Sequence, residues 1–84
     1  MQFQGAVLKE QGVTFAIVIV KSYVLNSSNR ENVRQSFAPY FPNMPIILMA
    51  QDSRGVPTYH GRTDIAKFLA NLHISQIPWK RYTA

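Results

Sequence analysis

Two short runs of hydrophobic residues stand out along the chain. Residues 14–20 and 46–50 are apolar or β-branched at every position, which is typical of strands buried on both faces. A mixed segment, residues 2–10, precedes the first run. Gln11 and Gly12 lie between the two and predict a tight hairpin turn, because glycine readily takes a positive φ. We therefore expect residues 2–10 and 14–20 to pair as antiparallel strands.

A second hairpin is predicted over residues 46–60. Asp52 and Gly55 occupy the first and fourth positions of a four-residue segment, and these are the preferred residues of a type I turn at those positions. Residues 56–60 then return as a strand. Pro57 has no amide proton to donate to a neighbouring strand, so it favours a place at the sheet edge or at the start of the strand.

The first helix is predicted after residue 28. Ser28 and Glu31 form a capping-box pattern, in which each side chain accepts a hydrogen bond from a backbone amide of the first turn. Pro39 disfavours helical geometry in the residue before it, so the helix should end or tighten within residues 38–41. Apolar side chains recur on one face of this helix, at Val33, Phe37, Tyr40 and Phe41.

The second helix is predicted to follow Gly61. Thr63 suits the N-cap position and Asp64 suits the positive first turn. The helix should run to about Leu72 or His73, where a histidine interacts favourably with the helix dipole. Its apolar stripe has helical spacing and consists of Ile65, Phe68, Leu69 and Leu72.

The order strand–strand–helix occurs twice and predicts one α+β domain over residues 1–84, a length too short for two domains. We expect a two-layer sandwich with both helices on one face of a four-stranded, largely antiparallel sheet. The tail, residues 74–84, is too apolar for a free terminus. It should pack on the domain or on a partner.

The second half of the chain resembles the C-terminal part of the thioredoxin fold. Met44 and Pro45 precede an apolar strand, and a short hairpin, Gly61 and an amphipathic helix follow. In that fold a proline also precedes the corresponding strand. The family's paired active-site cysteines have no counterpart in this chain, which contains no cysteine, so the resemblance implies no redox role.

The predicted sheet has more hydrophobic surface than the two predicted helices can cover, which suggests that the chain associates with a second copy. Two helices cover only one face of such a sheet, whereas the first apolar run is hydrophobic on both faces. Either the tail or a second copy must cover the other face, and we favour a homodimer because small domains without disulfides commonly associate. Its interface would contain Phe15, Ile17 and Ile19, with Trp79 as an anchor.

Charge gives an alternative function. Nine Lys and Arg residues against four Asp and Glu residues give a formal net charge of +5, which favours anionic partners. Lys80 and Arg81 lie between Trp79 and Tyr82, and such a basic and aromatic segment suits nucleic acid or another anionic ligand. No known phosphate-loop or RNA-binding motif accompanies this segment. The other basic residues assigned to this surface are Arg30, Arg34 and Arg62.

Catalysis is not expected. The serines lie in turn, cap or helix positions that account for them, and His60 and His73 lack the spacing of a metal site. His60 is the better candidate for binding, since it stands beside Tyr59 where a strand meets the second helix, whose first amides attract anions. We expect no catalytic residues, no cofactor and no metal.

The longest uninterrupted apolar run, residues 15–20, has six residues, whereas a helix needs roughly 20 to cross a bilayer. The first residues show no secretory signal pattern, so we expect a cytoplasmic location. The sequence therefore predicts a small cytoplasmic, non-catalytic interaction module that associates with itself through an apolar sheet face. The alternative is a protein that binds nucleic acid or an anionic ligand.

Overall fold

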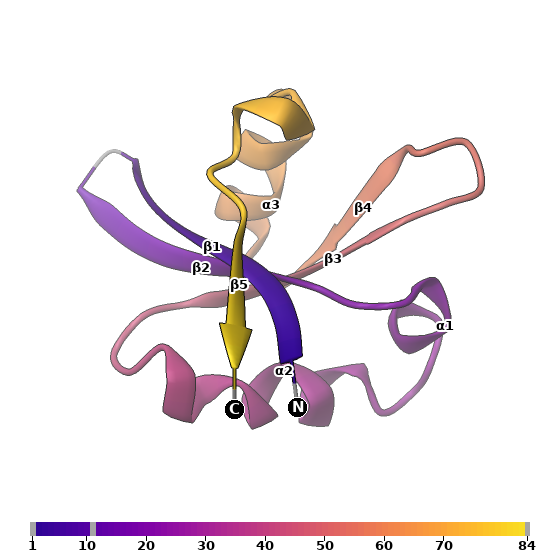
Figure 1. The fold of residues 1–84 in the computed structure, drawn as a ribbon, viewed down its shortest axis with the longest axis horizontal. Coiled ribbons are helices and arrows are strands. Elements are labelled where there is room, and N and C mark those ends of the chain that lie inside the picture. The colour runs from indigo at the N-terminus through magenta and orange to yellow at the C-terminus, as the bar shows by residue number, and fades with distance from the viewer. Residues whose placement is uncertain (1, 11, 84) are drawn as a thin grey trace.

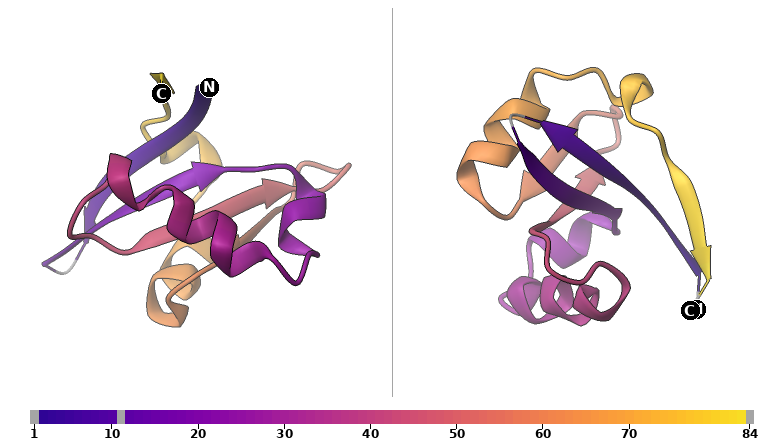
Figure 2. Two further views of the ribbon diagram at one scale, coloured as in Figure 1. Left: turned by 90° about the horizontal axis from the view of Figure 1, so that it is seen from below. Right: turned by 90° about the vertical axis from the view of Figure 1, so that its left-hand side faces the viewer.

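The computed structural model describes residues 2–10 and 12–83, which form one five-stranded sheet with helices on both of its faces (Figure 1, Figure 2). The strands are β1 (Gln2–Glu10), β2 (Val13–Ile19), β3 (Ile46–Gln51), β4 (Pro57–His60) and β5 (Lys80–Thr83). The helices are α1 (Ser22–Leu25), α2 (Arg30–Ser36) and α3 (Thr63–Ala70), with two 3₁₀ turns, η1 (Ala38–Tyr40) and η2 (Ile74–Gln76).

The sheet has the strand order β4-β3-β2-β1-β5. β2 and β3 are parallel, and the other neighbouring strands are antiparallel. The prediction of an α+β fold with a largely antiparallel sheet is confirmed, but the sheet has five strands, not four, and one of its pairs is parallel. The chain leaves β2 and returns through α1 and α2 along one face before β3 begins, and a crossover of this kind makes the two strands parallel.

The fifth strand comes from the C-terminal tail. Lys80 to Thr83 pair antiparallel with β1, so that Thr83 lies opposite Gln2 (Figure 1). The ring of Tyr82 stacks on Phe3 with centroids 5.2 Å apart and meets Phe41 edge-on at 5.1 Å. Aromatic contacts of this kind add to the stabilisation from buried area, so β5 is held by side chains as well as by its ladder.

Both faces of the sheet are covered by the chain itself. Figure 2 shows α2 on one side of the sheet and α3 on the other. Leu48 is fully buried on the α2 side, in a cluster with Val18 and Phe37, and its neighbour Ile47 is fully buried on the α3 side, in a cluster with Leu69. The predicted two-layer arrangement, with both helices on one face, is therefore wrong.

Two of the residues predicted for a dimer interface, Phe15 and Ile17, are enclosed by the chain itself. Phe15 and Ile17 are 1% and 0% exposed, because α3 and the segment after it cover them, and Ile19 and Trp79 pack against the same cluster. Side chains already enclosed in one copy cannot also form the core of an interface with a second. The expectation of a homodimer loses the observation on which it was based.

Gly61 directs the chain to the second face. It follows β4 with φ 154°, and a Cβ atom at this position would lie 2.5 Å from Ile47 Cδ1 and 3.0 Å from the Ile46 carbonyl oxygen. A side chain at this position would therefore collide with β3. The close approach allows the chain to turn directly into α3 on the Ile47 side of the sheet.

Of the two predicted turns, the one over residues 52–55 can be checked in full and the one at residues 11–12 only in part. Gln11 lies outside the described residues, but Glu10 pairs with Val13 and Gly12 has φ 80°. In the second turn the Gly55 amide donates to the Asp52 carbonyl at 3.0 Å. The turn over residues 52–55 is confirmed, and so is the edge position of β4, predicted from its proline.

Three helix-end predictions are wrong. The α2 N-cap is Asn29, not Ser28, and it has no side-chain cap. The Glu31 carboxylate, expected to complete the capping box, binds Arg34 and His60. Thr63 is the first residue of α3 and not its N-cap. His73 lies beyond the end of α3 and caps η2, where its Nδ1 accepts a hydrogen bond from the Ser75 amide at 3.2 Å.

Candidate functional site

The basic residues assigned to binding from the sequence do not gather at one place. Arg30 and Arg34 lie on α2, and Tyr59 and His60 lie on β4 at one sheet edge. Lys80 and Arg81 begin β5 at the opposite edge, directly after Trp79. The structure therefore divides the predicted site into separate regions, each with its own surroundings.

Arg34 and His60 form contacts within the chain that hold secondary-structure elements together. The Glu31 carboxylate accepts two hydrogen bonds from Arg34, at 2.8 and 2.9 Å, and lies 2.7 Å from His60 Nε2. The hydrogen bonds from Arg34 and from His60 lower the pKa of Glu31 to about 2, so this carboxylate is ionised at neutral pH and in mild acid. Arg34 also donates to the Ile46 carbonyl at 3.2 Å. The cluster ties α2 to the start of β3 and the end of β4.

Tyr59 and His60 do not form a shared pocket. Consecutive residues of a strand point to opposite faces, so Tyr59 packs on the α3 side whereas His60 meets α2. Burial raises the pKa of Tyr59. Its buried hydroxyl oxygen makes no hydrogen bond to the part of the chain that the structure describes. The predicted pairing of these two residues at one binding site is wrong.

Arg62 stands at the start of α3, beside its own acidic partner. Its guanidinium donates to both oxygens of Asp64, at 2.9 and 2.8 Å, which raises the pKa of Arg62 and lowers that of Asp64. Arg30 donates to the Leu25 carbonyl at 3.4 Å. Arg62 is thus largely neutralised by its neighbour, and Arg30 is partly engaged by the backbone.

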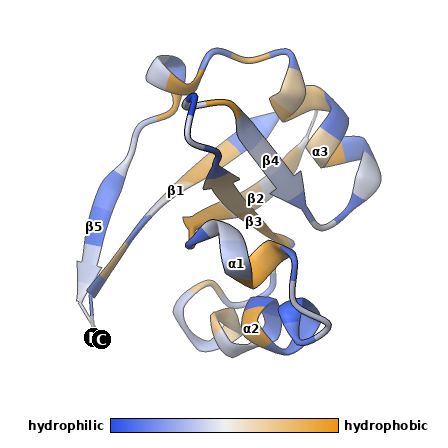
Figure 3. Cartoon of the chain, turned by 90° about the vertical axis from the view of Figure 1, so that its right-hand side faces the viewer, coloured by the Kyte–Doolittle hydropathy of each residue, from blue (hydrophilic) through white to orange (hydrophobic). Residues whose placement is uncertain are grey.

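In the basic and aromatic segment 79–82, the two aromatic side chains are not exposed for binding as predicted. Trp79 is half-buried and donates its indole N–H to the Ile74 carbonyl at 3.1 Å, and Tyr82 stacks on Phe3. The two aromatic rings therefore serve packing and are not free to stack on bases. Lys80 and Arg81 are exposed on the edge strand and form no salt bridge to residues 2–10 or 12–83. Figure 3 shows the hydrophilic character of this part of β5.

A shallow concavity of about 290 Å³ adjoins Arg81. It is lined by Gln2, Phe3, Gln4, Ile19 and Arg81, and Gln4 lies directly opposite Arg81 in the β1–β5 ladder. Neither glutamine was predicted from the sequence to have a role. Their spacing of two residues in a strand, which places both on one face, is the signal that identifies them.

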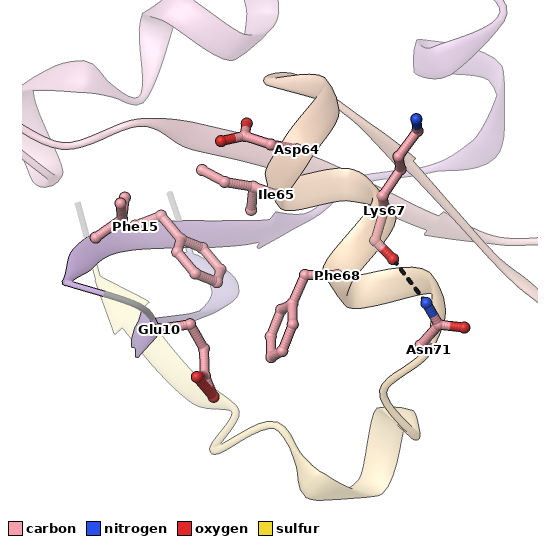
Figure 4. Close-up of a pocket in the computed structure, with 8 residues that line it drawn as sticks. Glu10, Phe15, Asp64, Ile65, Lys67, Phe68 and Asn71 are labelled. Carbon is pink, nitrogen blue, oxygen red and sulfur yellow. Dashed lines mark hydrogen bonds between the residues drawn. The ribbon is translucent and has the colours of Figure 1, made fainter.

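A second and larger hollow, about 360 Å³, lies between the β1–β2 hairpin and α3 (Figure 4). Its walls include Glu10, Phe15, Ile65 and Phe68. Of these, only Phe15 was named from the sequence as an exposed contact residue, and it is instead part of the floor of this groove. Glu10 was not predicted to bind a ligand, since an isolated acid at a strand end has no distinctive pattern.

Within residues 2–10 and 12–83, no three His, Cys, Asp or Glu residues lie together as metal ligands would. In the same ranges no helix has the length and hydrophobicity needed to cross a membrane. Comparison with models of known protein families, with curated proteins and with solved structures gives no match. The function must therefore be argued from the geometry of the chain itself.

Proposed function

We propose that the protein is a non-catalytic binding domain whose ligand is single-stranded nucleic acid, held along β5 and the adjoining end of β1. The observation that carries this proposal is the exposed pair Lys80 and Arg81, which lies beside Gln2 and Gln4 without an acidic partner in the described ranges. Association through an apolar sheet face, the interpretation favoured from the sequence, is not proposed again because both faces are enclosed.

The hydrogen-bond partners of the acidic residues support the proposal. Glu31 is bound by Arg34 and His60, Asp64 is bound by Arg62, and Asp52 accepts hydrogen bonds from turn amides. Three of the four acids in the chain therefore serve local structure. None of these three carboxylates forms a salt bridge with Lys80 or Arg81.

The chemistry of the concavity fits a nucleotide strand. The planar guanidinium of Arg81 can donate two parallel hydrogen bonds to a phosphate. The amides of Gln2 and Gln4 each offer donors and an acceptor, which are the groups that recognise base edges. Lys80 points to the other face of the sheet, because it is adjacent to Arg81 in the strand. The edge of β5 is thus flanked by positive charge on both sides.

Charged residues on an edge strand also prevent edge-to-edge association, so the experiment must separate binding from that role. We expect a fluorescein-labelled single-stranded oligonucleotide to bind with an affinity that falls about sevenfold between 50 and 200 mM salt, which corresponds to two phosphate contacts. Replacing Arg81→Gln should roughly halve the slope of log affinity against log salt. Fluorescence anisotropy measures both quantities.

The matched control is Arg54→Gln. Arg54 lies in the β3–β4 turn, beside the opposite edge of the sheet from β5, and its replacement removes the same charge. The control should leave the salt slope within error of the wild type. Absence of binding at 50 mM salt, or equal losses in the two variants, would reject the proposal.

A further inference from the structure

The groove between the β1–β2 hairpin and α3 has the size and lining of a small-molecule site. Its volume of about 360 Å³ lies in the range typical of ligand pockets, which are mostly apolar with a few polar groups at defined places. Eight residues line it: Glu10, Val13, Phe15, Asp64, Ile65, Lys67, Phe68 and Asn71.

The floor of the groove is aromatic and aliphatic. Figure 4 shows the rings of Phe15 and Phe68 beside the same space, with Ile65 above them. Phe15 and Ile65 are almost completely buried, so their positions are fixed by the core. Phe68 is only partly buried, so a hydrocarbon body placed here loses contact with water against its ring, and the face of that ring also attracts a cation.

The charged groups around the groove are not equally available. Asp64 is held by Arg62, the Lys67 ammonium points away from the space in Figure 4, and the Asn71 amide donates to the Lys67 carbonyl at 3.2 Å. The Glu10 carboxylate borders the groove and has neither a hydrogen bond nor a salt bridge to the described part of the chain. The groove therefore presents one unused negative charge beside aromatic rings.

We propose that this groove binds an organic ammonium ion carried on an apolar body. The ammonium N–H groups donate to the Glu10 carboxylate, and the hydrocarbon part lies against the partly exposed ring of Phe68, above the buried Phe15 and Ile65. A carboxylate gives charge-assisted hydrogen bonds that are stronger than neutral ones, and the Phe68 ring adds cation–π attraction. The proposal is independent of nucleic-acid binding, because the groove and the β5 concavity share no lining residue.

The test uses three ligands of one shape and different charge. Isothermal titration of the full chain with 2-phenylethylammonium, 2-phenylethanol and 3-phenylpropionate compares a cation, a neutral molecule and an anion. We expect the ammonium ion to bind with a Kd of about 1 mM or tighter, and the other two to bind at least tenfold more weakly. Tighter or equal binding of 3-phenylpropionate would instead indicate Lys67 as the partner and overturn the proposal.

Two variants of equal net charge identify the carboxylate. Glu10→Gln and Gln35→Lys each raise the net charge by one, and Gln35 is exposed on α2, on the opposite side of the sheet. Glu10→Gln should weaken binding of the ammonium ion about tenfold, whereas Gln35→Lys should change it less than twofold. Both positions are exposed, and unchanged circular dichroism confirms folding. Equal weakening in the two variants, or no saturable binding in the wild type, would refute the site.

Discussion

Truncation of either Ile47 or Leu48 to alanine is expected to lower the free energy of unfolding by about 2–5 kcal/mol. The two side chains are neighbours in β3, each is 0% exposed, and they lie in the separate clusters on the two faces of the sheet. Each truncation removes buried methyl groups and leaves a cavity that the surrounding core cannot fill. Urea unfolding followed by the fluorescence of Trp79, the single tryptophan, measures both losses.

The two variants together test whether each face is a core in its own right. Val56 is 54% exposed, so Val56→Ala is the control and should change stability by less than about 0.5 kcal/mol. If only one of the core variants is costly, with the other below about 1 kcal/mol, the face that tolerates truncation is not enclosed as described.

Replacement of Gly61 by alanine is expected to cost about 3 kcal/mol, from an unfavourable backbone conformation and from overpacking against β3. The Cβ atom would lie 2.5 Å from Ile47 Cδ1 and 3.0 Å from the Ile46 carbonyl oxygen. The side-chain contact can give way by a rotation, but the backbone oxygen cannot move without distorting the first residues of β3. Chemical denaturation against the wild type measures the loss.

Gly12 supplies the matched control, because it also has a positive φ but has no atom within 4 Å of the position that a Cβ would take. Gly12→Ala should therefore show only the conformational cost, about 1 kcal/mol. The Ile47→Val background removes the Cδ1 atom and should reduce the cost of Gly61→Ala. Equal costs at the two glycines would mean that the close approach to β3 does not matter.

The central strands could be predicted from the sequence because a strand buried on both faces has an uninterrupted run of apolar residues. Residues 14–20 and 46–50 have no polar side to turn toward water, and they became β2 and β3. No comparable sequence pattern indicates which face of the sheet a helix covers. The stripe of Ile65 and Leu69 shows that α3 has an apolar face but not which face of the sheet it meets. That choice depends on the turn at Gly61, which is a tertiary contact with Ile47.

The fifth strand was missed for a different reason. Lys80, Arg81, Tyr82 and Thr83 contain one apolar residue, too few to show an alternating pattern. The tail as a whole was expected to pack on the domain or on a partner, and the structure places its Tyr82 on Phe3. The pairing of the tail with β1 joins opposite ends of the chain, and no local signal specifies such a contact.

The contacts at the candidate sites also differ in how far the sequence alone could predict them. The contact between Glu31 and Arg34 follows from their spacing of three residues in a helix, whereas the contact of Glu31 with His60 joins positions 29 residues apart and appears only in the folded chain. Lys80 and Arg81 were identified from their charge and their aromatic neighbours in the sequence. Gln2, Gln4 and Glu10 acquire a possible role only because the fold brings β5 beside β1 and α3 beside the hairpin.

The most direct test of the central claim, that one copy encloses both faces of its own sheet, is sedimentation equilibrium of the wild type over a hundredfold range of concentration. The account predicts a single species of 9.6 kDa throughout, because folding then needs no partner. A species of twice that mass that dissociates only as the protein unfolds would contradict it.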